Sequence, residues 1–144
     1  MTPHGEAQAR AAGAKLPDGV VNLWTSPKRR AQQTAAGYGL SVTPKIDIDL
    51  RPIDGEITWN DWGRAWALGE EPSPAEVENL VDGVARAKAV LGKARALTDA
   101  GQTTVLVTHS DMSALLLGAL RELPLMDRFY IYKLETAEIV CVPL

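Results

Sequence analysis

The chain has 144 residues, 46% of them hydrophobic, and a formal net charge of -3. This length predicts one domain over residues 1–144, and the negative charge argues against a general nucleic-acid binder. The single cysteine excludes an internal disulfide and a CxxC metal site, and no apolar run approaches the roughly 20 residues of a membrane span. We therefore expect a cytoplasmic protein with no metal, no cofactor, and no membrane or nucleic-acid partner.

Helices and strands are predicted to alternate along the chain. Thr2 and Pro3 are typical of a helix N-cap and first helical position, and that helix should end by Pro17-Asp18-Gly19. The next predicted elements are a buried strand over 20–25, a helix from 26–27 to about 36, and short strands over 40–43 and 46–48. They are followed by a short helix over 59–66, a long helix from 73–74 to about 100, a buried strand over 103–108, an apolar helix capped by Ser110 or Asp111, and two strands over 129–134 and 137–142. This order predicts an α/β fold, a three-layer α/β/α sandwich.

Two further features of the chain are a set of spaced tryptophans and the single cysteine. Trp59, Trp62 and Trp66 share one face of the short predicted helix, where they either clamp an apolar or ring-containing substrate or pack as core or lid. Cys141 lies in an apolar run, which predicts a buried thiol without a functional role.

Two segments place polar side chains where predicted strands end, and ligands of α/β sheets collect beyond the carboxyl ends of strands. LWTSPKRRAQQTA (23–35) puts Arg30 on the first turn of a helix, where a guanidinium and free N–H groups suit a phosphate. VLVTHSDMSALLL (105–117) puts His109 before a helix, where an imidazole can bind an anion or act as an acid or base. Together they predict an oxyanion pocket. If each segment is considered alone, the plainer alternatives are that Arg30 belongs to a solvated helix start and that His109 is a capping or core-edge histidine.

These segments resemble the histidine phosphatase superfamily, branch 1, whose members are phosphoglycerate mutase-like. TSPKRRAQQTA (25–35) is similar to the family signature S-P-x-x-R-A-x-Q-T-A, VLVTH (105–109) to its V-L-V-x-S-H strand, LRPID (50–54) to L-R-E-I-D, and ETAEI (135–139) to its last strand. The resemblance implies a phosphoglycerate mutase-like fold and phosphomonoester hydrolysis or transfer through a phosphohistidine. It also implies a phosphate site at Arg30, His109 and Ser26, with His109 catalytic.

The N-terminus departs from the family pattern, in which a first strand ends in R-H-G and supplies the nucleophilic histidine and an arginine. PHGE (3–6) invites that interpretation, but the three residues before His4 are too few for a strand of about 5–6 residues. MTPHGEAQARAAGAKL (1–16) is instead similar to the family's later L-T-P-x-G-x-x-Q-A-x-x-x-G-x-x-L helix. We therefore expect His4 to be exposed on a helix and the first central strand to be missing, unless a start upstream of Met1 supplies it.

The carboxylates of the site also depart from the family pattern. Pro52 stands where the family has its acid glutamate, and Asp54 or Glu56 is either a substitute or a solvated loop carboxylate. Asp111, two positions after His109, would repel a phosphate unless it points into the helix cap.

Three functions follow as alternatives. The chain is a histidine-phosphatase-type enzyme, or a catalytically inactive pseudophosphatase that binds a phosphorylated small molecule, an anion or a protein partner, or an enzyme in which His109 serves altered acid–base chemistry. A sheet without a central strand leaves backbone groups unpaired, so we also expect either a homodimer that covers the gap or marginal stability.

Overall fold

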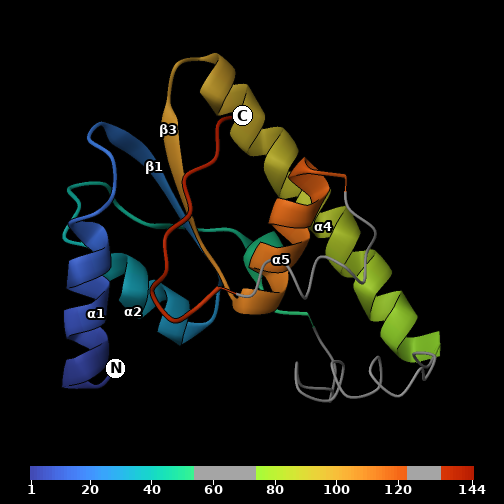
Figure 1. Cartoon of the computed structure of the whole chain (residues 1–144), viewed down its shortest axis with the longest axis horizontal. Helices are drawn as coiled ribbons and strands as arrows, with labels where there is room; N and C mark the ends of the chain where they lie inside the picture. The colour runs from blue at the N-terminus through green and yellow to red at the C-terminus, as the bar shows by residue number, and fades with distance from the viewer. Residues whose placement is uncertain (54–73, 123–133) are drawn as a thin grey trace.

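The computed structural model describes residues 1–53, 74–122 and 134–144, and within them the backbone alone of 74–80 (Figure 1). Its elements are α1 (Pro3–Gly13), β1 (Val20–Thr25), α2 (Arg29–Gly37), β2 (Lys45–Ile46), the 3-10 helix η1 (Ile48–Leu50), α4 (Pro74–Asp99), β3 (Thr103–Val107) and α5 (Ser110–Leu120).

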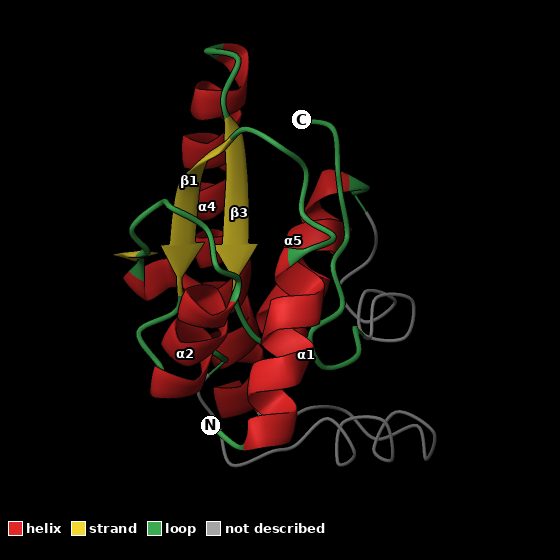
Figure 2. Ribbon diagram, turned by 90° about the vertical axis from the view of Figure 1, so that its left-hand side faces the viewer, coloured by secondary structure: helices red, strands yellow, loops and turns green. Residues whose placement is uncertain are grey.

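The described strands form one parallel sheet in the order β2-β1-β3. The register of β1 and β3 runs from Val20 opposite Thr103 to Thr25 opposite Val107. Figure 2 shows β1 and β3 side by side and pointing the same way, with α4 behind them. Because parallel strands end at the same edge of a sheet, the turns that follow Thr25 and Val107 lie together.

Helices cover both faces of the sheet. On one face, α4 and α5 pack against β1 and η1 in a buried apolar cluster of Trp24, Leu50, Ala87, Val90, Ala94, Met112, Leu115 and Leu116. On the other face, Leu23 and Val107 pack against Ala31 and Ala35 of α2. Successive residues of a strand point to opposite faces, which is why Leu23 and Trp24 belong to different clusters. The predicted α/β/α fold is confirmed, with three strands in the described residues.

Most predicted elements are present where the sequence places them. The Thr2 hydroxyl accepts a hydrogen bond from the Gly5 N–H at 3.1 Å, with Pro3 at the first helical position of α1. The apolar runs form β1 and β3, the Ser26-Pro27 turn precedes α2, and α4 ends within a few residues of Gly101. His4 is exposed in the first turn of α1, as predicted.

The strands predicted over 40–43 and 46–48 are wrong in position. Residues 41–42 form a bend, and pairing begins only at Lys45, after Pro44, which has no N–H to donate to a ladder. The side chain of Asp47 accepts from the Asp49 N–H at 3.0 Å, and this cap starts η1 where the second strand was expected to continue.

The strand predicted over 137–142 is also wrong. A turn occupies 136–137 with Ala137 at φ 60, and the Glu138 N–H donates to the Glu135 carbonyl. Within the described residues, no backbone hydrogen bond joins 138–144 to β3, and an apolar run without a ladder partner does not become a strand. Cys141 is consequently exposed, which corrects its prediction as a buried thiol.

Three predictions concern residues outside the described part of the chain. They are the tryptophan stripe at Trp59, Trp62 and Trp66, most of the strand over 129–134, and the carboxylates of Asp54 and Glu56. In the described ranges, no helix combines the length and the apolar character needed to cross a bilayer.

Candidate functional site

Ser26 is buried at the turn between β1 and α2. Its N–H donates to the Val107 carbonyl at 2.9 Å, which extends the pairing with β3 by one residue. Its hydroxyl accepts from the Lys28 N–H at 3.2 Å, and its side chain is fully buried. This local hydrogen bond bends the chain away from the sheet, so that α2 begins at Arg29 and Arg30 lies on its first turn.

His109 is at the corresponding turn between β3 and α5. It is the N-cap residue of α5, and its carbonyl accepts from the Ser113 N–H at 2.8 Å. The prediction that Ser110 or Asp111 is the N-cap is therefore wrong, because α5 starts immediately after His109. The imidazole makes no capping hydrogen bond, which leaves both of its nitrogens available to neighbours across the sheet edge.

The three residues predicted to bind phosphate form one hydrogen-bonded chain. The Arg30 Nε and Nη2 atoms lie 3.3 and 3.1 Å from His109 Nδ1, across 79 positions of sequence. His109 Nε2 lies 2.8 Å from the Ser26 hydroxyl oxygen. A guanidinium has only donors, so Nδ1 must accept and the imidazole is neutral, with its proton on Nε2 directed at Ser26. The pairing expected from the two strand ends is thus present.

The environment of His109 favours this neutral form. Burial lowers its pKa below the ordinary 6.5, and the positive charges of Arg30 and Lys28 lower it further. Asp111 acts in the opposite direction, by a coulombic effect that raises the pKa. The hydrogen-bond pattern and the electrostatics therefore agree on a histidine that is neutral at pH 7.

The Asp111 carboxylate is hydrogen-bonded to nearby backbone groups. Oδ1 accepts from the Met112 N–H at 2.7 Å, and Oδ2 accepts from the Ile53 N–H at 2.8 Å. Both oxygens accept hydrogen bonds from backbone N–H groups, so the repulsion of an anion is reduced. This is the alternative from the sequence in which the Asp111 carboxylate points into the helix start. The link to Ile53 was not predicted, since no sequence pattern marks a contact between residues 58 positions apart.

Two helix N-termini meet at the site. Neither α2 nor α5 has a side-chain cap, and Lys28 and His109 are their respective N-cap residues. The partial positive charge of each helix start adds to the guanidinium of Arg30. This arrangement favours an anionic group with several acceptor oxygens, such as a phosphate.

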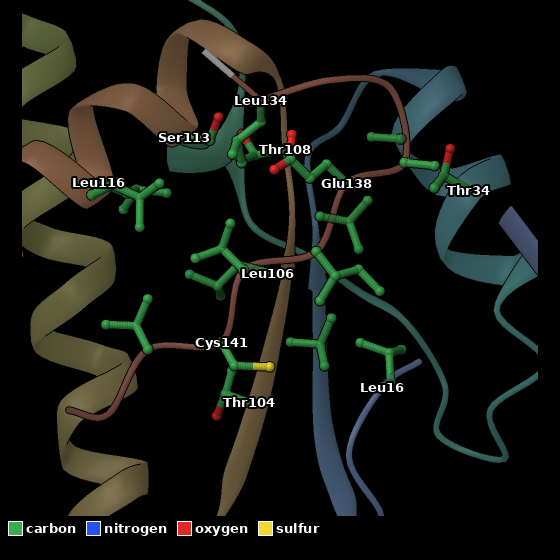
Figure 3. A pocket seen from close by; sticks show the side chains of 18 of the residues that line it. Leu16, Thr34, Thr104, Leu106, Thr108, Ser113, Leu116, Leu134, Glu138 and Cys141 are labelled. Carbon is green, nitrogen blue, oxygen red and sulfur yellow. The ribbon is translucent and has the colours of Figure 1, made fainter. Parts of the chain in front are cut away.

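A cavity of about 950 Å³ opens beside these residues and runs along β3. Arg30, Thr108 and His109 are among its lining residues. Figure 3 shows Thr108 and Ser113 at one end and Thr104 and Cys141 at the other, with Leu106 between them. The polar residues around His109 thus adjoin a larger, mostly apolar space.

In the described ranges, no group of three or more His, Cys, Asp or Glu side chains is arranged to bind a metal ion.

Comparison with models of known protein families finds a match to this chain. Residues 1–143 match the histidine phosphatase superfamily (branch 1). A search of curated proteins finds no match. The family match covers nearly the whole chain and includes both turns that carry the candidate site. The chain therefore belongs to branch 1 of the histidine phosphatase superfamily.

Proposed function

We propose that this protein binds the phosphoryl group of a phosphorylated small molecule at Arg30, His109 and Ser26. In the proposal this site serves a phosphomonoester hydrolase or phosphoglycerate mutase-like reaction. The observation that supports it best is the contact of the Arg30 guanidinium with His109 Nδ1 at 3.1 Å, at the meeting point of two helix N-termini.

Each of the three residues has a distinct part in this proposal. A phosphate oxygen is a stronger acceptor than an imidazole nitrogen, so a bound phosphate would take over the donors of Arg30 from His109 Nδ1. Released from Arg30 and facing an anion, the imidazole would then gain a proton and donate to a phosphate oxygen. Ser26 fixes the ring through Nε2, which leaves Nδ1 directed at the ligand. His109 is our candidate catalytic residue on this basis.

A cytoplasmic location stays a prediction, made from the sequence alone. We also propose that two copies of the chain associate along β3, because in the described residues this strand pairs only with β1. A second copy would supply hydrogen-bond partners for the backbone groups on the other side of β3.

Calorimetric titration of the full chain with inorganic phosphate at pH 7 tests the binding site. Arg30→Ala should weaken binding about tenfold, since it removes charge-assisted hydrogen bonds. Arg29→Ala is the matched control, because Arg29 is exposed on the same turn of α2 and is not among the residues that line the cavity. The absence of binding, or equal effects of the two substitutions, would overturn the proposal.

Hydrolysis of an aryl phosphate tests the reaction separately. Turnover that His109→Ala abolishes would support a phosphatase. Phosphate binding without turnover would instead support the pseudophosphatase alternative, in which the site only holds its ligand. If the protein neither binds nor turns over phosphate compounds, altered acid–base chemistry is the surviving alternative.

A further inference from the structure

Arg86 is a buried cation in the middle of α4 and lies outside the candidate site. Its side chain is 6% exposed, and its Nε donates to Asp82 Oδ2 at 2.9 Å, one helical turn earlier. Asp82 itself is 56% exposed, so the ion pair reaches from the interior to the surface. Burying a guanidinium is costly unless its remaining donors are satisfied, so these donors must have partners nearby.

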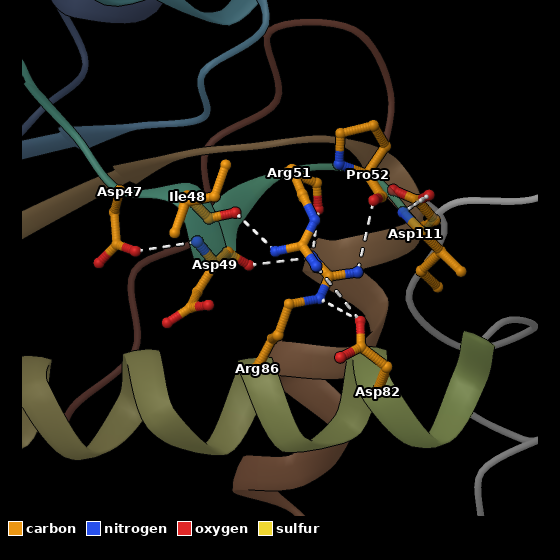
Figure 4. Close-up of polar contacts among 9 residues, drawn as sticks. Asp47, Ile48, Asp49, Arg51, Pro52, Asp82, Arg86 and Asp111 are labelled. Carbon is orange, nitrogen blue, oxygen red and sulfur yellow. Dashed lines mark hydrogen bonds and ion pairs between the residues drawn. The ribbon is translucent and has the colours of Figure 1, made fainter. Parts of the chain in front are cut away.

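The partners are backbone carbonyls of one short segment. Arg86 Nη1 donates to the carbonyls of Asp49 at 3.2 Å and Arg51 at 2.8 Å, and Nη2 lies 3.4 Å from the carbonyl of Pro52. Figure 4 shows the side chain rising from α4 into this segment. Residues 51–53 belong to no helix or strand, so the guanidinium supplies the donors that regular structure would otherwise provide.

The same segment is tied to the turn that carries His109. The Thr108 hydroxyl donates to the Leu50 carbonyl at 2.7 Å, and the Ile53 N–H donates to Asp111 Oδ2 at 2.8 Å. Thr108 directly precedes His109 and Asp111 follows it by two positions. Segment 49–53 thus lies between Arg86 on one side and both flanks of the histidine turn on the other.

We propose that Arg86 is a positioning residue for phosphate binding, because it fixes segment 49–53 and through Thr108 and Asp111 fixes the turn that presents His109. This inference rests on the proposed phosphate site, but part of its test does not. Arg86 touches neither Arg30 nor His109 in the described structure, so its influence must pass through the backbone of segment 49–53.

Arg86→Met in the full chain tests the inference, since methionine fills similar space without any donor. We expect the Ile53 amide to exchange with solvent at least about tenfold faster, measured by NMR in the folded protein. We expect phosphate to bind about fivefold more weakly, because the histidine turn is no longer held in one arrangement. Arg95→Met is the matched control, because Arg95 is an exposed arginine on the same helix.

Thr108→Val provides a second route if Arg86→Met fails to fold. It removes the hydroxyl that binds the Leu50 carbonyl without touching the buried charge, and it should weaken phosphate binding in the same direction. A folded Arg86→Met protein with unchanged Ile53 exchange and unchanged phosphate affinity would overturn the inference. An unfolded Arg86→Met protein would also overturn it if the Thr108→Val protein binds phosphate normally. If the unmodified protein binds no phosphate, the proposed function fails, while Ile53 exchange still decides the structural role of Arg86.

Discussion

Thr25 and Val107 are register partners at the last positions of β1 and β3, and their pairing determines where the candidate site forms. The two strands are parallel, so the residues that follow them leave the sheet at the same edge. The Ser26 N–H continues the ladder to the Val107 carbonyl, which fixes the Ser26 turn against the turn of His109. A contact across 79 positions of sequence thus depends on the parallel pairing of β1 with β3.

The first prediction concerns the protonation of His109. Its folded-state pKa is lowered, chiefly by burial and then by Arg30, so unfolded chains bind more protons than folded ones just below pH 6.5. The contribution of His109 to the free energy of unfolding should therefore be complete above the pKa of the unfolded chain. The free energy of unfolding should fall as the pH drops below 6.5. Urea unfolding at a series of pH values measures this, and His109→Gln should make the pH dependence flatter over that window.

The same imidazole should report phosphate binding. A phosphate that takes the donors of Arg30 and faces the ring raises the pKa of His109, because it stabilises the imidazolium. NMR titration of the ring proton with and without phosphate measures the shift. The resonance of His4, exposed on α1, is the internal control and should not respond. A His109 signal that phosphate leaves unchanged would contradict the proposed site.

Sequence patterns anticipated the pairing of Arg30 with His109 for a definite reason. Both residues follow apolar runs that predict buried strands, and parallel strands in an α/β fold end at a common edge. The role of Arg86 was not predictable in this way. It occupies an ordinary position in a long predicted helix, and its burial depends on carbonyls of 49–52 that come near only after folding.

The run at 137–142 is a case in which composition predicts an element that the structure does not form. Its apolar and β-branched composition is typical of a strand, but strand formation depends on a partner with free backbone groups. Within the described part of the chain, segment 134–144 contributes lining residues to the cavity beside β3 without joining the ladder. Composition alone could not distinguish these two outcomes.

A third prediction tests how Ser26 holds the imidazole. The fully buried hydroxyl lies 2.8 Å from His109 Nε2 and accepts from the Lys28 N–H, so Ser26→Ala leaves two donors without an acceptor. We expect a loss of about 1–3 kcal/mol in the free energy of unfolding, measured with urea. Ser113→Ala is the control, because the Ser113 hydroxyl donates to the Ser110 carbonyl within the same helix start, and it should cost less. Equal losses would show that Ser26 has no special part.

A fourth prediction contrasts two helical glycines. A Cβ on Gly13 would lie 2.2 Å from the Tyr38 carbonyl oxygen, where α1 packs against the end of α2, whereas a Cβ on Gly92 of α4 would meet nothing within 4 Å. Gly13→Ala should therefore destabilise the protein by at least about 1–3 kcal/mol. Gly92→Ala should stabilise it by about 0.5–1 kcal/mol, because alanine restricts the unfolded chain and fits a helix. Thermal unfolding of both variants measures the difference, and a shift of the same sign in both would contradict the packing of α1 on α2.

The last prediction concerns the side of β3 that faces away from β1. The Val107 carbonyl points to β1, where it accepts from Ser26, and backbone groups alternate along a parallel strand. The N–H and carbonyl groups of Thr104 and Leu106 therefore point to the other side, where the described residues contain no strand. The Thr104 hydroxyl, which projects from a face of the sheet, is buried without a hydrogen-bond partner among the described residues.

Unpaired strand edges associate, so we expect the sedimentation coefficient to rise with protein concentration. Thr104→Pro removes one outward N–H without altering the groups that pair with β1, and it should weaken self-association while the circular dichroism spectrum keeps its helical signal. Val21→Pro, a proline at an exposed residue of β1 in the same sheet, is a control for general damage to the strands. A chain that sediments as a monomer at every concentration and unfolds in one sharp transition would show that β3 needs no second copy.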